Sequence, residues 1–108
     1  MARTVLRGIP ASPGQAKGKV KIVSDPSQCK KVKRGDILVT WMTNPLFLPA
    51  MRRASAIVTD IGGLLCHAAI VSRELKIPCI VNTGKATSIL KNGQKIFVDA
   101  SKGEIYRQ

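Results

Sequence analysis

The sequence predicts a single compact α/β domain in which short strands outnumber short helices. Its 108 residues suit one domain and leave little room for a second. Apolar runs rich in β-branched residues recur between glycine and proline turn signals, and one segment keeps a sustained helical repeat. No internal repeat, low-complexity tract or linker divides the chain, so we expect residues 1–108 to fold as one unit.

The first third of the chain predicts two strands around a loop. "TVLRGIPASPGQAKGKVKIV" has a strand-like start, then a Pro/Gly-rich loop with a turn at residues 12–14. Val20 and Ile22 then alternate with lysines, which indicates a half-buried strand. The polar segment 25–36 follows as a connection that ends in a turn at Gly35 and Asp36.

The middle of the chain alternates short strands with short helices. Residues 37–41, "ILVTW", form an apolar run that predicts a buried strand. Residues 44–54 predict a loop leading into a short helix, with Pro49 in its first turn, where a missing N–H costs little. "SAIVTD" at 55–60 predicts another strand, which delivers the chain to two consecutive glycines.

Residues 67–76 are the best helix candidate. One side of the 3.6-residue repeat is formed by Ala68, Val71 and Leu75, while Ser72, Arg73 and Lys76 fall largely elsewhere. Pro78 is expected to end this helix. A strand that stops at Gly84, a short helical turn, a turn at residues 92–93 and a closing hairpin around residues 101–103 complete the predicted elements.

The composition favours some partners over others. The formal net charge of +12 predicts attraction to an acidic or phosphorylated partner. Aromatic residues are scarce, and a single-strand binder would interleave stacking platforms with its charges, so nucleic acid is not expected as the main partner. The three cysteines lack CxxC spacing, and with one histidine no metal site is expected. No secretory signal or membrane-spanning run is visible, which predicts a cytoplasmic protein without membrane contact.

The only histidine of the chain, His67, follows two glycines and opens the predicted helix. Glycines let backbone N–H groups approach an anion, and the first turn of a helix has free N–H donors at its positive end. A neutral imidazole nitrogen there can attack phosphorus and carry the phosphoryl group as a covalent intermediate. The spacing alone leaves two readings open, because a lone histidine at a helix start is often structural.

"TDIGGLLCHAAIVSRELKIPCIVNTGKAT" closely resembles the signature of the swivelling phosphohistidine domain of phosphoenolpyruvate (PEP)-utilising enzymes. That family includes PEP synthase, pyruvate phosphate dikinase and the first enzyme of the sugar phosphotransferase system. "LRGIPASPGQAKGKVKIV", "GDILVTWMTNP", "MRRASAIVTD" and "LKNGQKIFVDASKGEIY" extend the likeness over nearly the whole chain. The resemblance implies a swivelling β/β/α fold over residues 1–108.

The resemblance also implies a site and its partners. His67 would be the phosphorylated residue of a phosphoryl carrier, Gly62 and Gly63 would shape its loop, and Thr59 and Thr43 would support it. Arg73 matches the signature but lies about 120° around an ideal helix from the histidine, which favours a fold-supporting or docking role. This domain would bind no cofactor itself. ATP-binding and PEP/pyruvate-binding domains or subunits would be its partners and would hold Mg²⁺, ATP and PEP.

The two residues that directly precede the histidine, Leu65 and Cys66, depart from the family pattern. Leu65 stands where a hydroxyl residue is usual, and losing a hydroxyl contact to a charged group costs about 1.5–3 kcal/mol. Cys66 stands where many relatives have serine, and we expect it mainly to pack. The alternative is therefore a catalytically degenerate homologue that acts as a binding or regulatory module.

Overall fold

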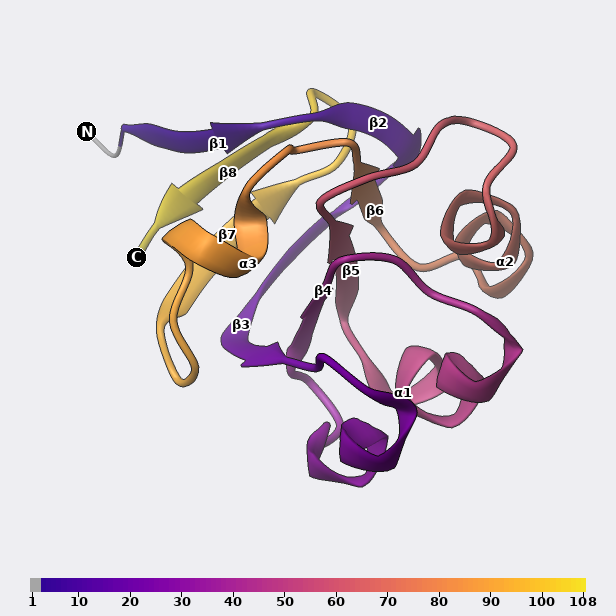
Figure 1. Ribbon diagram of the computed structural model, residues 1–108. Helices are drawn as coiled ribbons and strands as arrows, with labels where there is room; N and C mark the ends of the chain where they lie inside the picture. The colour runs from indigo at the N-terminus through magenta and orange to yellow at the C-terminus, as the bar shows by residue number, and fades with distance from the viewer. Residues whose placement is uncertain (1–2) are drawn as a thin grey trace.

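The computed structural model describes residues 3–108, which form eight strands in the order β1-β8-β7-β3-β4-β5-β6-β2 (Figure 1). The strands are β1 (Thr4–Arg7), β2 (Ile9–Ser12), β3 (Gln15–Ile22), β4 (Ile37–Thr40), β5 (Ala56–Thr59), β6 (Cys79–Val81), β7 (Lys95–Asp99) and β8 (Glu104–Arg107). The helices are α1 (Leu48–Arg53), α2 (His67–Leu75) and α3 (Ala86–Ile89), with 3₁₀ turns η1 (Pro26–Lys31) and η2 (Pro45–Phe47). No helix in this part of the chain is long and apolar enough to cross a membrane.

β3 joins two layers of sheet because its two halves have different partners. Residues 15–19 pair antiparallel with β7, whereas residues 20–22 pair parallel with β4. The antiparallel layer is β1-β8-β7-β3, and the second layer continues as parallel β4, β5 and β6 with antiparallel β2 at its edge. In Figure 1, α1 and α2 lie on the far side of the second layer from the antiparallel strands. The layering confirms the predicted α/β class and the β/β/α arrangement.

The parallel strands β4, β5 and β6 are apolar up to the terminal threonines of β4 and β5, because both of their faces are covered. In β4, Ile37 and Val39 enter the core between the two sheets, whereas Leu38 enters the core beneath the helices. In β6, Ile80 likewise enters the core between the two sheets, whereas Cys79 enters the core beneath the helices. This double burial explains why continuous apolar runs, rather than alternating ones, identify these strands in the sequence.

α2 packs on β2 and β6 through small side chains, and its buried face differs from the predicted one. Ala68, Ala69 and Ser72 are buried, whereas Val71 and Leu75 are only partly buried. The assignment of Ser72 to the polar side was therefore wrong. Small side chains let the helix approach the sheet closely, so the larger apolar residues flank the contact instead of filling it.

Three element boundaries also differ from the sequence prediction. Residues 9–12, within the segment predicted to hold a Pro/Gly-rich loop, form strand β2, where Pro10 is tolerated because an edge strand has an unpaired side. Trp41 lies outside β4 and is 57% exposed, so it does not belong to the buried strand. β6 ends at Val81, since Asn82 adopts a left-handed backbone with φ of 59°.

The closing hairpin of β7 and β8 and the turn around Gly103 confirm the prediction for the end of the chain. Gly103 has φ of 72°, and a Cβ there would lie 2.4 Å from the carbonyl oxygen of Gly8. The Gly8 N–H donates to the Gly103 carbonyl at 2.9 Å. Glycine is thus required where the hairpin turn meets the link between β1 and β2.

Candidate functional site

The candidate site lies at the carboxyl ends of β4 and β5, where two loops meet the first turn of α2. Thr40 and Thr59 are paired in register at the ends of these parallel strands. Beyond them, the Asp60 N–H donates to the carbonyl of Thr40 at the end of β4, and the Ile61 N–H donates to the carbonyl of Trp41 in the following loop, both at 3.1 Å. The two loops are therefore joined by backbone hydrogen bonds at an edge of the sheet where α/β proteins commonly bind ligands.

His67 is the first residue of α2, and its ring makes one side-chain hydrogen bond. The Nδ1 atom lies 2.8 Å from the Oγ1 atom of Thr43, a residue that is only 2% exposed. When Nδ1 carries the proton, it donates to the Thr43 hydroxyl, and Nε2 then holds the lone pair. The pairing fixes the ring orientation and leaves Nε2 as the nitrogen available for reaction.

A small hollow of about 110 Å³ adjoins the imidazole. It is lined by Met42, Thr43, Ile61, Gly62, Cys66, His67 and Ala68. The lining comes from both loops and from the start of α2, so the loops and the helix together shape the space beside the ring. The sequence-predicted residues Thr43, Gly62, Cys66 and His67 are brought together here.

Cys66 occupies the N-cap position of α2, and its side chain makes no capping hydrogen bond. Its carbonyl accepts the first helical bond from the Ile70 N–H at 3.0 Å. The N–H groups of the first helical turn have no partner within the helix, so they are donors next to His67. An anion on the histidine would lie near these donors and the positive end of the helix.

The two glycines before α2 have different roles. Gly62 has φ of 132°, and a Cβ at this position would lie 2.8 Å from the Cys66 Sγ atom. Gly62 is therefore required by backbone conformation and by space. A Cβ on Gly63 would meet nothing within 4 Å, so this glycine leaves one side of its backbone open.

Thr59 supports the loop without contacting the histidine. Its hydroxyl donates to the Ile61 carbonyl at 2.7 Å, and its own carbonyl accepts from the hydroxyl and the N–H of Thr83. The Thr40 hydroxyl makes the equivalent bond to the Met42 carbonyl at 3.3 Å. Thr43 is thus the threonine next to the imidazole, and Thr59 holds the backbone that leads to Gly62.

Arg73 also acts on the loop rather than on the imidazole. Its Nη2 atom donates to the Leu64 carbonyl at 2.7 Å, and its Nη1 atom donates to the Ala11 carbonyl of β2 at 3.0 Å. The guanidinium therefore connects the middle of the loop before His67 to the edge strand. The sequence favoured a fold-supporting or docking role for Arg73, and in the structure its guanidinium holds two backbone segments together.

Asp60 is a supporting residue that the sequence reasoning missed. It is 6% exposed, and its carboxylate accepts hydrogen bonds from the N–H and the hydroxyl of Thr87 on α3. Its carbonyl accepts from the Gly84 N–H at 2.8 Å. The sequence signal that could have identified Asp60 is its position, directly after a buried strand and shortly before two glycines.

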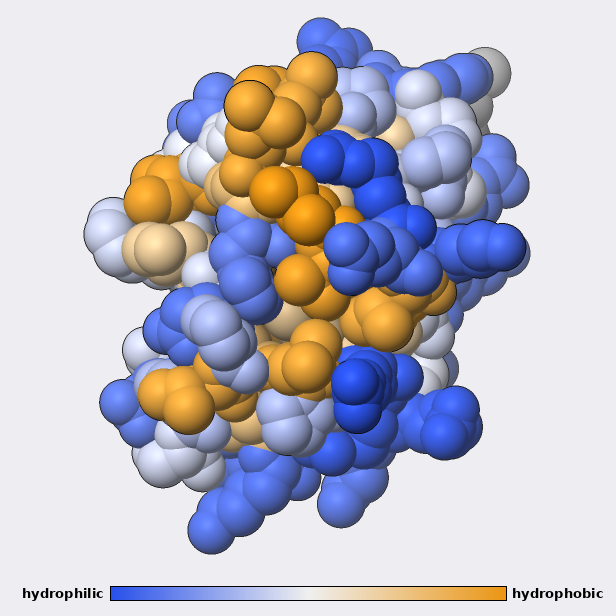
Figure 2. Space-filling view, turned by 90° about the vertical axis from the view of Figure 1, so that its right-hand side faces the viewer, coloured by the Kyte–Doolittle hydropathy of each residue, from blue (hydrophilic) through white to orange (hydrophobic). Residues whose placement is uncertain are grey.

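Exposed large apolar side chains surround the site. Among residues 3–108 these are Trp41, Met42, Leu46, Ile61, Leu64, Leu65 and Ile70, which we call the apolar rim. They come from the loop after β4, the loop after β5 and the outer side of α2. Figure 2 shows apolar side chains spread over the face that carries these elements. Leu65 has the largest exposed fraction of these side chains, 84%.

Comparison with known proteins decides the family. Residues 32–103 match the family model described as PEP-utilising enzyme, mobile domain. The chain belongs to this family. The resemblance seen in the sequence is thereby confirmed, and the extent of the mobile domain over all of residues 1–108 stays a prediction.

PEP synthases resemble this mobile domain over almost its whole length. The phosphoenolpyruvate synthase of Pyrococcus furiosus is 56% identical over 106 residues, which cover 98% of this chain and 13% of that protein. The probable phosphoenolpyruvate synthase of Methanothermobacter thermautotrophicus is 54% identical over 102 residues, covering 94% and 15%. The phosphoenolpyruvate synthase of Neisseria meningitidis is 50% identical over 105 residues, covering 94% and 13%. The mobile domain is thus homologous to a segment of these proteins.

Solved structures support the fold. The solution structure of Enzyme I matches with a TM-score of 0.61 and 26% identity, covering 71% of this chain and 32% of that one. Aconitase X from Thermococcus kodakaraensis matches with a TM-score of 0.72, covering 95% and 97%, but its 19% identity shows the fold alone. The β/β/α layering is therefore also found in Enzyme I and in aconitase X.

Proposed function

We propose that this mobile domain is the phosphoryl carrier of a PEP synthase-like or pyruvate phosphate dikinase-like system. His67 accepts a phosphoryl group at a nucleotide site and delivers it to a pyruvate/PEP site, both on other domains or subunits. The observation that carries the proposal is the 2.8 Å hydrogen bond between His67 Nδ1 and Thr43 Oγ1, which leaves Nε2 as the reactive nitrogen.

The transfer requires one bond to form and one to break. The Nε2 lone pair attacks phosphorus, an N–P bond forms, and the P–O bond to the leaving oxygen breaks with its electron pair going to that oxygen. The ring becomes positively charged as the N–P bond forms. The Thr43 hydroxyl then accepts a stronger hydrogen bond from Nδ1–H, because the donor is charged. Transfer to the acceptor reverses these steps.

The surroundings of His67 suit a phosphorylated ring. The phosphoryl group brings about two negative charges to the start of α2, where the first-turn N–H groups lack a side-chain cap. The helix dipole favours such a charge by about 0.3–1 kcal/mol, and direct N–H contacts add to this. The open side of Gly63 gives the loop backbone access to the same group.

The proposal places the remaining chemistry on partners. Mg²⁺, ATP and PEP are held by the ATP-binding and PEP/pyruvate-binding domains, and this chain supplies the carrier. The apolar rim around His67 provides a contact surface that excludes water when the histidine enters a partner site. The net charge of +12 favours approach to acidic or phosphate-loaded surfaces.

The test is phosphoryl transfer from PEP carrying a radioactive phosphate, with the cognate partner domains present. The wild-type chain is expected to take up label that is stable in base and labile in acid, and His67→Gln is expected to take up none. Circular dichroism of His67→Gln controls for folding. Label that persists in His67→Gln, or no label with any cognate partner, would refute the carrier function.

A second candidate function rests on Leu65. This side chain is 84% exposed beside the histidine and offers no hydrogen bond to a phosphoryl group. A catalytically degenerate module would bind its partner through the apolar rim with an affinity that His67→Gln leaves unchanged. Such a module would stay unphosphorylated in Leu65→Thr as well, whereas the carrier is expected to be labelled faster, by about tenfold, with the hydroxyl restored.

A further inference from the structure

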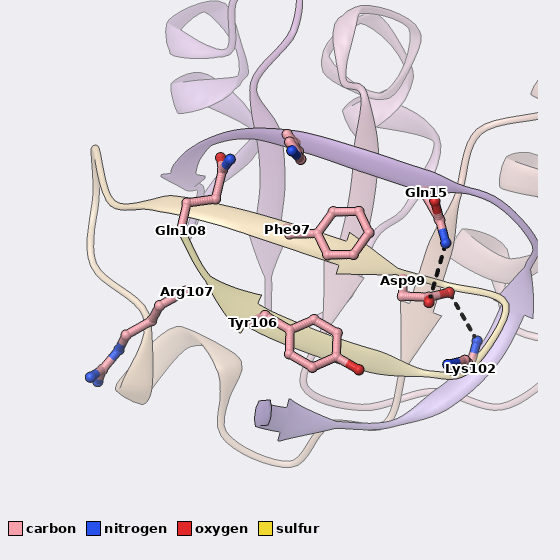
Figure 3. Close-up of a pocket in the computed structure, with 8 residues that line it drawn as sticks. Gln15, Phe97, Asp99, Lys102, Tyr106, Arg107 and Gln108 are labelled. Carbon is pink, nitrogen blue, oxygen red and sulfur yellow. Dashed lines mark hydrogen bonds between the residues drawn. The ribbon is translucent and has the colours of Figure 1, made fainter. Parts of the chain in front are cut away.

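A broad hollow of about 740 Å³ lies on the outer side of the antiparallel layer, away from the layer that positions His67. Its lining includes Lys17, Phe97, Asp99, Lys102, Tyr106 and Arg107, which we call the outer face (Figure 3). Side chains alternate along a strand, and Ile96, Val98 and Ile105 enter the core between the sheets. The side chains of Phe97 and Tyr106 therefore point outward. The hollow is shallow and open to solvent, so a ligand would lie on the strands and not inside a cavity.

Two of the four aromatic residues of the chain lie side by side on this face. Phe97 and Tyr106 are cross-strand partners, with ring centroids 5.8 Å apart and ring planes 22° from parallel. Neither ring is a member of the two apolar cores. Figure 3 shows both rings broadside over β7 and β8, so their flat faces are presented to the hollow. They form a platform on which a planar group can stack.

Cations lie over and beside the aromatic platform. The Lys17 Nζ atom lies over the Phe97 ring, 5.9 Å from its centroid, and Lys102 and Arg107 line the same hollow. Further along the ladder, Lys19 lies directly opposite Lys95. Like charges at directly opposed positions destabilise a sheet. An anionic group bound over these two lysines would relieve that repulsion.

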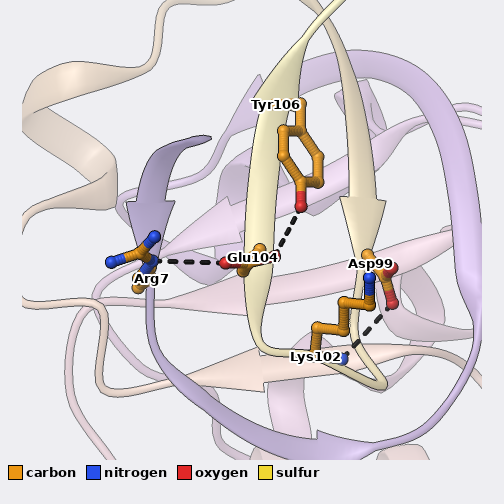
Figure 4. A network of polar contacts seen from close by, with 5 residues as sticks. All are labelled: Arg7, Asp99, Lys102, Glu104 and Tyr106. Atoms are coloured by element: carbon orange, nitrogen blue, oxygen red, sulfur yellow. Dashed lines mark hydrogen bonds and ion pairs between the residues drawn. The ribbon is translucent and has the colours of Figure 1, made fainter. Parts of the chain in front are cut away.

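The carboxylates of this region are already engaged (Figure 4). Glu104 forms an ion pair with Arg7 at 3.3 Å and accepts a hydrogen bond from the Tyr106 hydroxyl. Asp99 accepts hydrogen bonds from the Gln15 side chain and the Lys102 backbone N–H, both at 3.3 Å. Within residues 3–108 the Arg7–Glu104 contact is the one ion pair, so the lysines of this region lack carboxylate partners.

We propose that the outer face binds a nucleotide unit, with its base on Phe97 and Tyr106 and its phosphate beside Lys17. A flat π surface next to unpaired cations matches a ligand that is both aromatic and anionic. An acidic peptide would use the lysines alone and leave the platform uncovered. The unit is supplied either by a free nucleotide or by an unpaired stretch of nucleic acid, and these two sources share the same contacts.

The fold brings the aromatic residues and the cations together on one face, which the sequence pattern did not indicate. Aromatic residues are too sparse in the sequence to interleave with the charges, which disfavoured nucleic acid as a partner. Pairing of β7 with β8 sets the two rings, nine positions apart in the sequence, side by side, and pairing of β7 with β3 adds Lys17 from a distant part of the chain. The outer face is also independent of His67, so the two sites can be tested separately.

Two titrations of the full chain test the proposal, one with adenosine monophosphate and one with a short fluorescent single-stranded oligouridylate. Backbone amide NMR spectra locate the bound ligand, and fluorescence anisotropy gives the affinity for the strand. Phe97→Leu and Tyr106→Leu keep the apolar bulk but remove the π surface. Lys17→Gln removes a charge at the face, and Lys30→Gln is its matched control on the exposed surface of η1.

Binding by either probe, with amide shifts in β3, β7 and β8, supports the proposal. Each leucine variant is expected to weaken binding about 5- to 150-fold, the effect of losing one stacked base. For the strand, Lys17→Gln is expected to lower the slope of log affinity against log salt by about 0.7, and Lys30→Gln to leave it nearly unchanged. Binding of the mononucleotide identifies a free nucleotide as the source, and binding of the strand alone identifies nucleic acid.

Several results would overturn the proposal. These are no binding by either probe, amide shifts confined to other elements, or strand binding that both leucine variants leave intact while lysine loss anywhere weakens it. The last result would indicate non-specific attraction to the charge of +12. Unchanged amide spectra outside the substituted strands confirm that the variants fold. Phosphorylation of His67 is expected to be unaffected by Phe97→Leu, which keeps this test separate from that of the carrier function.

Discussion

The Thr43 Oγ1 and His67 Nδ1 atoms lie 2.8 Å apart, and their hydrogen bond ties the loop after β4 to the first turn of α2. The two residues are 24 positions apart in the chain. Because β4 and β5 are parallel and paired in register, their following loops leave the sheet at the same edge. The fold thereby gives the only histidine a partner for one nitrogen and leaves the other nitrogen free to react.

Replacing Thr43 with valine is expected to slow phosphorylation of His67. Valine keeps the shape of the buried side chain but cannot accept from Nδ1–H, so the positive ring in the transition state loses about 1–2 kcal/mol. This corresponds to a loss of about 5- to 30-fold in the rate constant measured by rapid quench. Thr43→Ser is the matched control and should retain most of the rate. Equal rates for valine and threonine would show that the hydrogen bond has no role in the transfer.

Removing the Arg73 guanidinium is expected to loosen the loop before His67. Arg73→Met keeps the aliphatic stem but loses both hydrogen bonds to the carbonyls of Ala11 and Leu64. We expect the free energy of unfolding to fall by about 1–3 kcal/mol, measured by urea denaturation. Hydrogen exchange of the amides at 61–66 should accelerate in the same variant. An unchanged stability and exchange rate, combined with lost phosphorylation, would instead indicate direct phosphate binding by Arg73.

The two glycines of the loop should respond differently to alanine. Gly62→Ala forces a side chain into φ of 132° and towards the Cys66 Sγ atom, so we expect a loss of about 1–3 kcal/mol in stability. Gly63→Ala meets open space and serves as the control, with a change below about 0.5 kcal/mol. Thermal unfolding followed by circular dichroism compares them. Similar losses for both glycines would contradict the different roles that the geometry assigns to them.

The buried thiol of Cys79 should make stability fall at high pH. Burial raises the pKa of Cys79 to about 12, against 9.0 for the free thiol, so the folded state holds its proton where the unfolded state loses it. Since the folded state binds more protons between these values, stability decreases as the pH rises above about 9. Urea unfolding at several pH values, compared with Cys79→Ala, isolates this contribution. A parallel pH dependence in the two proteins would contradict it.

The apolar rim should affect docking without affecting the fold. Leu46 is 68% exposed and contributes little to the core, so Leu46→Ser is expected to leave the free energy of unfolding within about 0.5 kcal/mol of the wild type. If the rim contacts the partner, the KM for the partner domain in His67 phosphorylation should rise about 3- to 30-fold. Lys30→Gln, a charge change outside the rim, is the control. An unchanged KM in Leu46→Ser would remove this residue from the docking surface.

The sequence was informative where one local pattern determines the structure. Strands β4 and β5 were predictable because burial on both faces favours a continuous apolar run, which each strand keeps up to its terminal threonine. The closing hairpin was predictable from its turn residues. β2 was not predictable, because Pro10 is read as a loop signal. Its pairing with β6 is also non-local, since Pro10 lies opposite Ile80, 70 positions away in the chain.

The candidate site was also predictable only where a local pattern determines it. His67 and Gly62 could be found from the motif, since the glycine conformation and the helix start are local properties. The resemblance also named Thr43 as a support, but its hydrogen bond with Nδ1 could not be predicted, because that contact depends on the register of two strands. The hydrogen bond from Arg73 Nη1 to the Ala11 carbonyl likewise joins a helix to an edge strand that the sequence did not predict.

The most direct test of the carrier function is to identify the phosphorylated nitrogen. The chain has one histidine, so ¹⁵N-labelled imidazole gives an unambiguous phosphorus–nitrogen correlation spectrum after reaction with PEP and the cognate partner domains. A phosphoramidate coupled to Nε2, with Nδ1 still protonated and bonded to Thr43, is the expected result. Phosphorus bound to Nδ1, or no phosphoramidate at all under conditions in which the partners turn over with an authentic carrier, would contradict it.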